Sequence, residues 1–275
     1  MTDDARPSAR GNAAPRDRVD VRTPNVARMY DYYLGGKDNF AADREAAKKA
    51  LEAVPEGRAT IRENRAFLGR AVRFLAGEAG IRQFLDIGTG LPTQDNTHEV
   101  AQKVRPDSRI VYVDNDAVVL SYARALLAKD SQTIVVEGDM RRPEEILADP
   151  GLRGHIDLDR PVAVLLVSML HFVPDEAEPA QIVATIREAI APGSYLAISH
   201  MTALVEEKAT QVTNVYEQAT SSATVRSREQ IQRLLTGFDL VDPGLVALQD
   251  WRPDAPPSEE SKAGSWFYAA VGRKP

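Results

Sequence analysis

The amino-acid sequence predicts an α/β fold, in which helices cover both faces of a largely parallel sheet. From residue 83 onward, short and nearly all-apolar segments rich in β-branched residues alternate with segments of helical periodicity. Strands buried on both faces have this composition, and helices are the usual connections between parallel strands. The expected strands are Gln83–Ile87, Arg109–Val113, Thr133–Glu137, Val162–Val167, Tyr195–Ser199, Leu245–Leu248 and Trp266–Val271.

The residues before the predicted sheet are expected to form a helical cap. Thr23 and Pro24 suit the N-cap and the first position of a helix, and the glycine pair at 35–36 suits its end. Helices are expected over Asn25–Leu34, Phe40–Val54 and Ala59–Ala76, with a later one at the capping box Ser227–Gln230. We therefore expect a disordered tail over residues 1–22, a helical cap over residues 23–80 and a sheet-bearing domain over residues 81–275.

The composition narrows the possible chemistry. The 275 residues include no cysteine, which excludes a cysteine nucleophile, a disulfide and a thiolate metal site. The four histidines show no ligand-like spacing, so no metal is expected. The net charge is −6, and basic residues are scattered among acidic ones. This pattern predicts a small-molecule substrate rather than a nucleic acid partner, and it leaves the oligomeric state open.

The sequence shows no signal for export or membrane insertion. The N-terminal residues lack the apolar core of a secretory signal. The longest apolar run, Val162–Leu170, is far shorter than the roughly 20 residues that span a membrane. We therefore expect a cytoplasmic protein that does not contact a membrane.

The segment FLDIGTGLPT, in which a predicted strand enters a glycine-rich turn, is the first candidate binding element. Its Gly88-x-Gly90 pattern can present backbone N–H groups to a ligand. The third glycine of a dinucleotide fingerprint is absent, because Thr93 occupies that position. Asp86 would repel a diphosphate but suits the ammonium of a methionine moiety. Pro92 fits the first turn of a following helix but removes one N–H group from it, which a ligand without phosphate tolerates. The turn therefore favours S-adenosylmethionine over NAD.

Acidic residues also follow the next two predicted strands. Asp114 and Asn115 follow the second strand, where they can hold ribose hydroxyls, although NAD would use them equally well. Asp139 follows the third strand and can accept from an adenine amino group, while Met140 can pack on the ring. Any one of these acids on its own fits a helix cap. Acids at three successive strand ends indicate a cofactor site.

The motifs LDIGTG, YVDND, EGDMR and VSMLHFVPD stand in this order along the chain, which resembles the seven-stranded S-adenosylmethionine-dependent methyltransferases. The segment PNVARMYDYYLGGKDNF is similar to an actinobacterial S-adenosyl methyltransferase family that was first described as a domain of unknown function. The resemblance covers about Pro24 to Arg273. It implies a Rossmann-like sheet of order 3-2-1-4-5-7-6, with helices on both faces and Trp266–Val271 inserted antiparallel. It also implies cofactor roles for Asp86, Gly88, Gly90, Asp114, Asp139 and Met140.

Methyl transfer mainly requires that an acceptor is aligned and that water is excluded. The fourth predicted strand ends at Ser168, which we expect beside the cofactor. His171 is the candidate general base and a candidate substrate-binding residue, although a histidine in this place is often structural. His200 is a weaker candidate. No Asn-Pro-Pro-Tyr or Asp-Pro-Pro-Tyr segment follows this strand, which argues against methylation of nucleic acid bases.

The N-terminal segment RMYDYYLGGKDNF is the other candidate for the site. It also fits an amphipathic helix with a simple glycine stop. Two adjacent glycines followed by Lys-Asp-Asn exceed what a stop requires, and glycine allows a backbone to approach a ligand closely. We therefore expect a lid, with Tyr30 and Tyr33 at the substrate and with Gly36 and Lys37 at the cofactor.

Together these patterns predict an S-adenosylmethionine-dependent methyltransferase that acts on an unidentified small molecule, through an oxygen or a nitrogen acceptor. A protein that binds S-adenosylmethionine or S-adenosylhomocysteine without catalysis is the first alternative. An NAD-dependent oxidoreductase is the second, and Thr93 and Asp86 speak against it.

Overall fold

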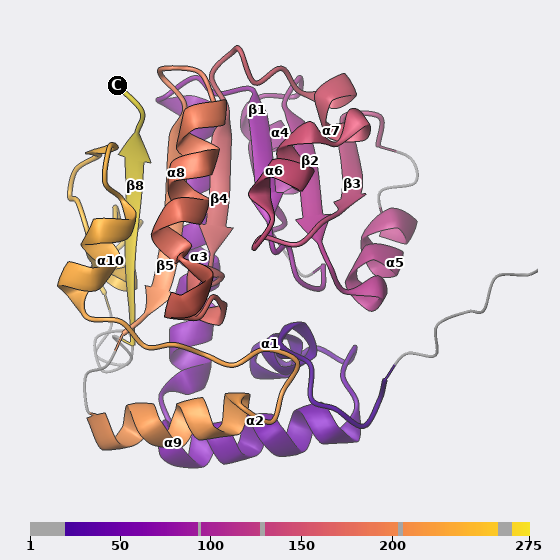
Figure 1. Ribbon diagram of the computed structural model, residues 1–275, viewed down its shortest axis with the longest axis vertical. Coiled ribbons are helices and arrows are strands. Elements are labelled where there is room, and N and C mark those ends of the chain that lie inside the picture. Colours follow the sequence, from indigo (N-terminus) through magenta and orange to yellow (C-terminus); the bar gives the residue numbers. More distant parts are fainter. Residues whose placement is uncertain (1–19, 93–94, 127–129, 203–205, 258–265) are drawn as a thin grey trace, which may run out of the picture.

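A single sheet of eight strands lies at the centre of the computed structural model, which describes residues 20–92, 95–126, 130–202, 206–257 and 266–275 (Figure 1). Its order is β3-β2-β1-β4-β5-β8-β6, and β7 also pairs with β8. The strands are β1 (Gln83–Ile87), β2 (Arg109–Asp114), β3 (Thr133–Glu137), β4 (Ala163–Val167), β5 (Tyr195–Met201), β6 (Asp239–Leu240), β7 (Val246–Ala247) and β8 (Phe267–Arg273).

The first five strands are parallel to one another, so their carboxyl ends meet at one edge of the sheet. β8 pairs with β5 in the antiparallel direction, which confirms the predicted insertion of the last strand. The predicted strand Leu245–Leu248 is wrong in length, because only the two residues of β7 pair with β8. The edge strand β6 was not expected from the sequence. Pro243 lies between β6 and β7 and has no N–H group for a continuous ladder.

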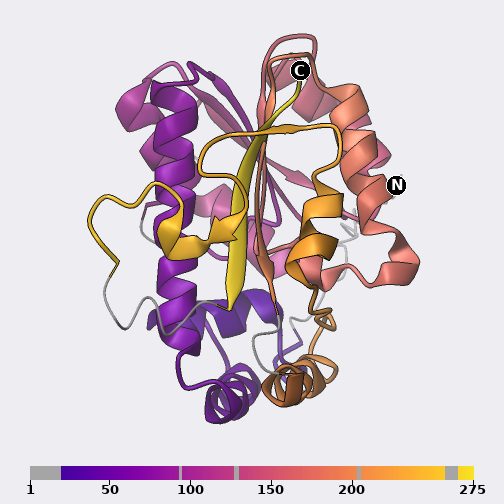
Figure 2. The same cartoon turned by 90° about the vertical axis from the view of Figure 1, so that its left-hand side faces the viewer.

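Helices cover both faces of the sheet, as predicted. Figure 2 shows the long helix α3 on one face and α8 with α10 on the other. The helices are α1 (Val26–Leu34), α2 (Ala41–Ala53), α3 (Gly57–Gly77), α4 (Thr97–Val104), α5 (Ala117–Leu126), α6 (Pro143–Ala148), α7 (Pro150–His155), α8 (Pro179–Ala189), α9 (Glu206–Tyr216) and α10 (Arg228–Leu234). Alternate residues of β4 supply the two cores: Leu165 packs on the α3 side and Leu166 on the α8 side.

The start of α1 differs from the prediction. Asn25, not Thr23, is the N-cap, and its side chain accepts from the amides of Ala27 and Arg28. An asparagine side chain reaches these amides as well as a threonine does, and the Thr23 carbonyl instead accepts from the Arg28 guanidinium. The capping box at Ser227–Gln230 is confirmed.

Helices α1, α2 and α9 form a layer below the carboxyl edge of the sheet (Figure 1). α9 lies beside α2 and contacts it, so residues far beyond position 80 contribute to the same layer as the N-terminal helices. Most of the predicted disordered tail lies outside the described residues. No helix in the part of the chain that the structure describes is long and apolar enough to cross a membrane.

Candidate active site

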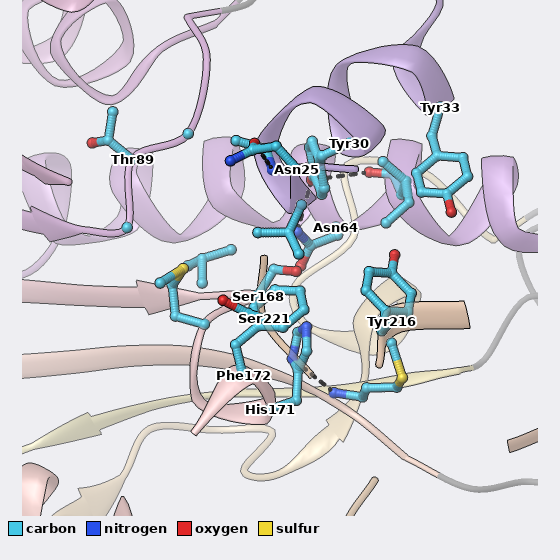
Figure 3. A pocket seen from close by; sticks show the side chains of 18 of the residues that line it. Asn25, Tyr30, Tyr33, Asn64, Thr89, Ser168, His171, Phe172, Tyr216 and Ser221 are labelled. Carbon is cyan, nitrogen blue, oxygen red and sulfur yellow. Dashed lines mark hydrogen bonds between the residues drawn. The ribbon is translucent and has the colours of Figure 1, made fainter. Parts of the chain in front are cut away.

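A cavity of about 440 Å³ lies between the carboxyl ends of β1–β4 and the helices α1, α2, α3 and α9. This is the edge at which parallel α/β sheets bind ligands. Figure 3 shows its length, with Thr89 at one end, Tyr33 and Tyr216 at the other, and Tyr30, Asn64 and Ser168 between them. Every predicted site residue except Gly36, Lys37 and the weaker candidate His200 lines this cavity.

The glycine turn after β1 forms part of the cavity wall. Gly88 and Gly90 have φ values of 77° and 64°, a region that side chains rarely adopt. A Cβ on Gly88 would lie 2.1 Å from the Met169 sulfur, so the Met169 side chain would have to move to admit one. No helix directly follows the turn: α4 begins at Thr97, and the expected place of Pro92 in a first helical turn is wrong. Thr93 lies outside the described residues.

Asp86, on β1, presents a buried carboxyl group at the cavity. Its Oδ2 accepts from the Thr97 hydroxyl at 2.7 Å. Burial raises the pKa of this carboxyl to about 6, while the Thr97 hydrogen bond and the charge of Arg65 oppose the rise and Asp114 adds to it. The group therefore ionises close to neutral pH, where a cationic ligand would favour its charged form.

Asp114, at the end of β2, has a carboxylate that accepts hydrogen bonds from two backbone amides. Oδ2 accepts from the Gly90 amide at 3.0 Å, and Oδ1 accepts from the Asp116 amide at 2.9 Å. A carboxylate offers about four lone-pair positions, so Asp114 can hold the glycine turn and still accept from a ligand hydroxyl. Asn115 lines the cavity beside it. Asp116 accepts from the Asn25 side chain at 2.5 Å and thereby ties the start of α1 to this loop.

Asp139, after β3, has a partner that sequence reasoning did not foresee. The Arg141 guanidinium donates to both carboxylate oxygens, from Nε at 2.9 and 3.0 Å and from Nη2 at 2.6 Å. These hydrogen bonds hold the pKa of Asp139 below its usual value. Met140 is buried and lines the cavity next to them. An adenine amino group would therefore share Asp139 with an exposed arginine.

Ser168 ends β4 in a strained conformation, with φ at 61°. Its amide donates to the Ser199 hydroxyl at 2.8 Å, and that hydroxyl donates to the Asn64 Oδ1 at 2.5 Å. The Asn64 amide nitrogen donates in turn to the Tyr30 hydroxyl at 2.8 Å. This relay joins β4, β5, α3 and α1, and strained residues held by such contacts are common at functional sites.

His171 is buried in the cavity wall and extends into the cavity in Figure 3. Its Nδ1 accepts from the Met201 amide at 3.5 Å, so in the neutral ring the proton lies on Nε2. Burial, with His200 and Arg226 nearby, lowers the pKa of His171 well below 6.5. With its proton on Nε2 the neutral ring can donate a hydrogen bond into the cavity, and its role as a general base stays a prediction from the sequence.

His200 is wholly engaged in structural hydrogen bonds. Its Nδ1 donates to the Met201 carbonyl at 2.7 Å, and its Nε2 accepts from the Arg226 guanidinium at 2.9 Å. Burial lowers the pKa of His200 to about 4. Neither nitrogen is left for a substrate, which removes His200 as a candidate base.

Only part of the predicted lid lies at the cavity. Tyr30 and Tyr33 line the cavity, whereas Gly36 and Lys37 do not. Gly36 lies against Asp31: a Cβ there would come within 1.9 Å of Oδ1. Asp31 in turn accepts from the Asp38 amide at 2.9 Å and from the Asn39 side chain at 2.7 Å. The second glycine is thus explained by the fold of its own loop.

Several lining residues were missed in the sequence. Asn64 is the one that a pattern could have revealed, because it is a buried polar residue on the apolar face of α3, between Ile61 and Leu68. The others come from segments that meet only in the folded chain. They are Asn25, Arg65, Arg141, Phe172, Tyr216, Thr220, Ser221, Trp266 and Phe267.

The strand order, the glycine turn and the acids at three strand ends define the protein as an S-adenosylmethionine-dependent methyltransferase of the seven-stranded type. More particularly, the chain belongs to the S-adenosyl methyltransferase family, whose model matches residues 12–275. A comparison with curated proteins finds no match.

Two solved structures are similar over nearly the whole chain. A candidate methyltransferase from Thermobifida fusca is 45% identical, with a TM-score of 0.89 over 95% of this chain and 99% of that one. A DUF574 family protein from Streptomyces avermitilis is 42% identical, with a TM-score of 0.89 over 94% and 100%. An O-methyltransferase family protein from Burkholderia thailandensis is 13% identical, with a TM-score of 0.52 over 83% and 62%, and shares the fold alone.

Proposed function

We propose that S-adenosylmethionine binds along the strand-end half of the cavity. Asp86 would face its ammonium, Asp114 and Asn115 its ribose, and Met140 with the Asp139–Arg141 pair its adenine. Three acids around a turn of positive-φ glycines, all lining one cavity, are the observation that carries this proposal. They fit a ligand that joins a cation, a ribose and an amino-substituted ring without a phosphate.

When bound, the cofactor supplies a methyl group that is activated on a sulfonium. The chain contributes alignment and exclusion of water, because the walls of the cavity are mainly buried side chains. We propose that the acceptor is a small molecule rather than a nucleic acid, which agrees with the net charge of −6. Within the described ranges no three His, Asp or Glu side chains are arranged to hold a metal ion. A cytoplasmic location stays a prediction from the sequence.

The Asp114→Ala variant tests the position of the cofactor. We expect its affinity for S-adenosylmethionine to fall by about 1–3 kcal/mol, because charge-assisted hydrogen bonds to the ribose are lost. Titration calorimetry measures the effect, and the matched control is Asp107→Ala, which removes an exposed acid outside the cavity. Unchanged affinity in a folded Asp114→Ala protein would remove this residue from the site.

Two further measurements separate this function from the alternatives. A thermal-shift comparison with S-adenosylmethionine, S-adenosylhomocysteine and NAD should show stabilisation by the first two alone. Transfer of a labelled methyl group to a metabolite extract should then distinguish the enzyme from a protein that only binds its cofactor. Stabilisation by NAD would contradict our interpretation of the glycine turn.

A further inference from the structure

The two ends of the cavity differ in charge. The end at the strand termini contains Arg65, Asp86, Asp114, Asp116, Asp139 and Arg141. At the other end, the described lining residues of α2, η1 (Leu170–Phe172), α9 and β8 are uncharged. Asp31, on α1, also lines the cavity, but its carboxylate is occupied by Asp38 and Asn39 in the loop after the helix. An anionic ligand in the helical end would therefore meet no positive charge among the described lining residues, and burying its unpaired charge there would be costly.

Aromatic rings gather at this uncharged end. The protein is only 6% aromatic, yet Tyr33, Phe172, Tyr216, Trp266 and Phe267 line this part of the cavity. Several of these rings contact one another. The ring centroids of Phe172 and Tyr216 are 5.8 Å apart, and the centroid of the His171 ring lies 4.3 Å from that of Phe172 and 5.3 Å from that of Phe267. These separations suit edge-on and offset contacts, which a further flat ring can extend.

The hydroxyls of Tyr33 and Tyr216 face each other at this end (Figure 3). A side-chain hydrogen bond between them is one of the influences on the pKa of each phenol. One hydrogen bond between them uses one of the two hydroxyl protons, so this end of the cavity presents mainly ring surface and one remaining hydroxyl donor. Both side chains are almost fully buried, at 5% and 7% exposure, so a molecule here would be enclosed.

Between the two ends stand uncharged hydrogen-bond donors. The Tyr30 oxygen accepts from Asn64, which leaves its own proton with only a long contact, 3.5 Å, to the Ile61 carbonyl. His171 carries its proton on Nε2, because Nδ1 accepts from the Met201 amide. Two neutral donors at the middle of the cavity suit a ligand atom that presents a lone pair.

We propose that the methyl acceptor is a flat, uncharged aromatic molecule that binds among these rings, with an oxygen or ring-nitrogen lone pair directed to the middle of the cavity. This proposal rests on the proposed function. In the reaction that it completes, the lone pair forms a bond to the methyl carbon, the carbon–sulfur bond breaks, and its electron pair stays on sulfur. A phenol would release its proton to water, since burial lowers the pKa of His171 and makes that ring a poor proton acceptor.

Binding of simple probes tests the proposal without requiring turnover. Calorimetry at pH 8 would compare 2-naphthol and isoquinoline with 2-naphthoate, which is charged, and with decahydro-2-naphthol, which is not flat. We expect both aromatic probes to bind at least about tenfold more tightly than 2-naphthoate, because of the charge that must be buried. We expect 2-naphthol to bind about threefold or more tightly than its saturated counterpart. Equal binding of 2-naphthoate or of decahydro-2-naphthol would overturn the proposal.

Variants of Tyr216 locate the binding. Tyr216→Phe keeps the ring and should retain 2-naphthol affinity within about twofold, whereas Tyr216→Leu should weaken it about fivefold. Phe172→Leu is a second variant should the first not fold, and it should act in the same direction. The affinity for S-adenosylhomocysteine should stay unchanged in all three. Equal affinity of the probe for the leucine variants and the natural protein would overturn this location.

Each titration is run on the free protein and on protein saturated with S-adenosylhomocysteine, so that the two proposals can fail separately. Loss of the aromatic preference in protein that binds S-adenosylhomocysteine contradicts the acceptor class alone. Absence of S-adenosylhomocysteine binding contradicts the proposed function, and the free protein then still reports whether the aromatic end selects flat, uncharged rings.

Discussion

At Asp86, burial and ligand charge act on one carboxyl group in opposite directions. Its pKa is raised to about 6 mainly by burial, and the facing groups are Arg65, Asp114 and the Thr97 hydroxyl. The proton is bound below that pH, and the neutral acid cannot attract an ammonium. We expect S-adenosylmethionine affinity to be level above about pH 7 and to fall as the pH drops through about 6. Calorimetric titrations between pH 5 and pH 8 measure this dependence.

The Asp86→Asn variant is the matched control for that prediction. Its affinity should be lower and should vary less with pH, because the amide does not titrate. Its melting temperature without ligand should rise. The folded-state pKa lies above the unfolded value of 3.8, so the stability that Asp86 contributes is present below pH 4 and is lost as the pH rises through about 6. A natural-protein curve as flat as that of the variant would contradict the assignment.

The sequence suggested that Gly36 is a glycine because it approaches a ligand, but its contact with Asp31 is sufficient to explain it. Gly36→Ala should lower the stability by about 1–3 kcal/mol, because its Cβ would displace the Asp31 carboxylate. Affinity for the cofactor, measured in the folded protein, should stay nearly unchanged. Gly154→Ala is the control, since that position has open space and an ordinary backbone conformation. A tenfold loss of affinity with unchanged melting would restore Gly36 to the site.

Among the elements, α1 and α2 depend on one buried ion pair. Arg28 Nε donates to Asp43 Oδ2 at 2.8 Å, and both side chains are at most 4% exposed. Asp43 also accepts from the amides of Asn25 and Phe40, at 2.8 and 2.7 Å, so it fixes the start of each helix. The Asp43 carboxylate, together with the contact between Asn25 and Asp116, therefore holds the helix that carries Tyr30 and Tyr33 over the cavity.

Asp43→Asn should reduce the free energy of unfolding by about 3–5 kcal/mol, because the buried Arg28 charge loses its partner. Asp107→Asn breaks an exposed pair with Arg82 and should change stability by less than about 1 kcal/mol. Chemical denaturation followed by circular dichroism measures both. Similar small effects in the two variants would show that the Arg28–Asp43 pair does not hold the cap.

The elements that the sequence predicted best are those with one strong local pattern. β1 and β3 have the predicted bounds, since in each a short apolar segment is followed directly by a glycine. The errors arose where several local patterns competed. Thr23 and Asn25 are both good N-caps, and the choice depends on Arg28 and Asp43, which no local pattern reveals. The two-residue strand β6 carries too few residues to show alternation.

At the scale of the whole molecule, Arg226 connects the segment before α10 to the loop after β4 that forms part of the site. Its guanidinium donates to the carbonyls of Leu170 and Val173, to Asp175 and to His200. These contacts hold the loop that carries His171 and Phe172. A lysine cannot reach so many partners from one position.

Arg226→Lys should lower stability by about 2 kcal/mol or more, because buried carbonyls lose their donors. It should also weaken 2-naphthol binding more than S-adenosylhomocysteine binding, since the loop after β4 carries Phe172. Arg228→Lys is the control, because Arg228 makes one hydrogen bond, to the Leu245 carbonyl. Melting curves and calorimetry measure both effects. Unchanged melting of Arg226→Lys would contradict the fastening role.

The site was predictable where its residues follow strands directly, and not elsewhere. Asp86, Asp114 and Asp139 lie at the ends of strands whose parallel arrangement brings them together, so a local motif was sufficient to find them. The partner of Asp139 was missed because an arginine two residues away is equally consistent with solvent exposure. Phe172 meets Tyr216, and His171 meets Phe267, only through the packing of α9 and β8, and no spacing in the sequence encodes these contacts.

Because α9 packs beside α2, the cavity combines residues from two separate parts of the chain. The carboxylates that we assign to the cofactor precede β4 in the chain, whereas Tyr216 and its helix lie on a later crossover beyond β5. A duplicated gene could thus exchange the residues of α9 and adopt a new acceptor while its cofactor chemistry is preserved. Directed evolution toward a new acceptor can therefore use mutant libraries that vary only the cavity-lining positions of α2 and α9, such as Leu51 and Val212.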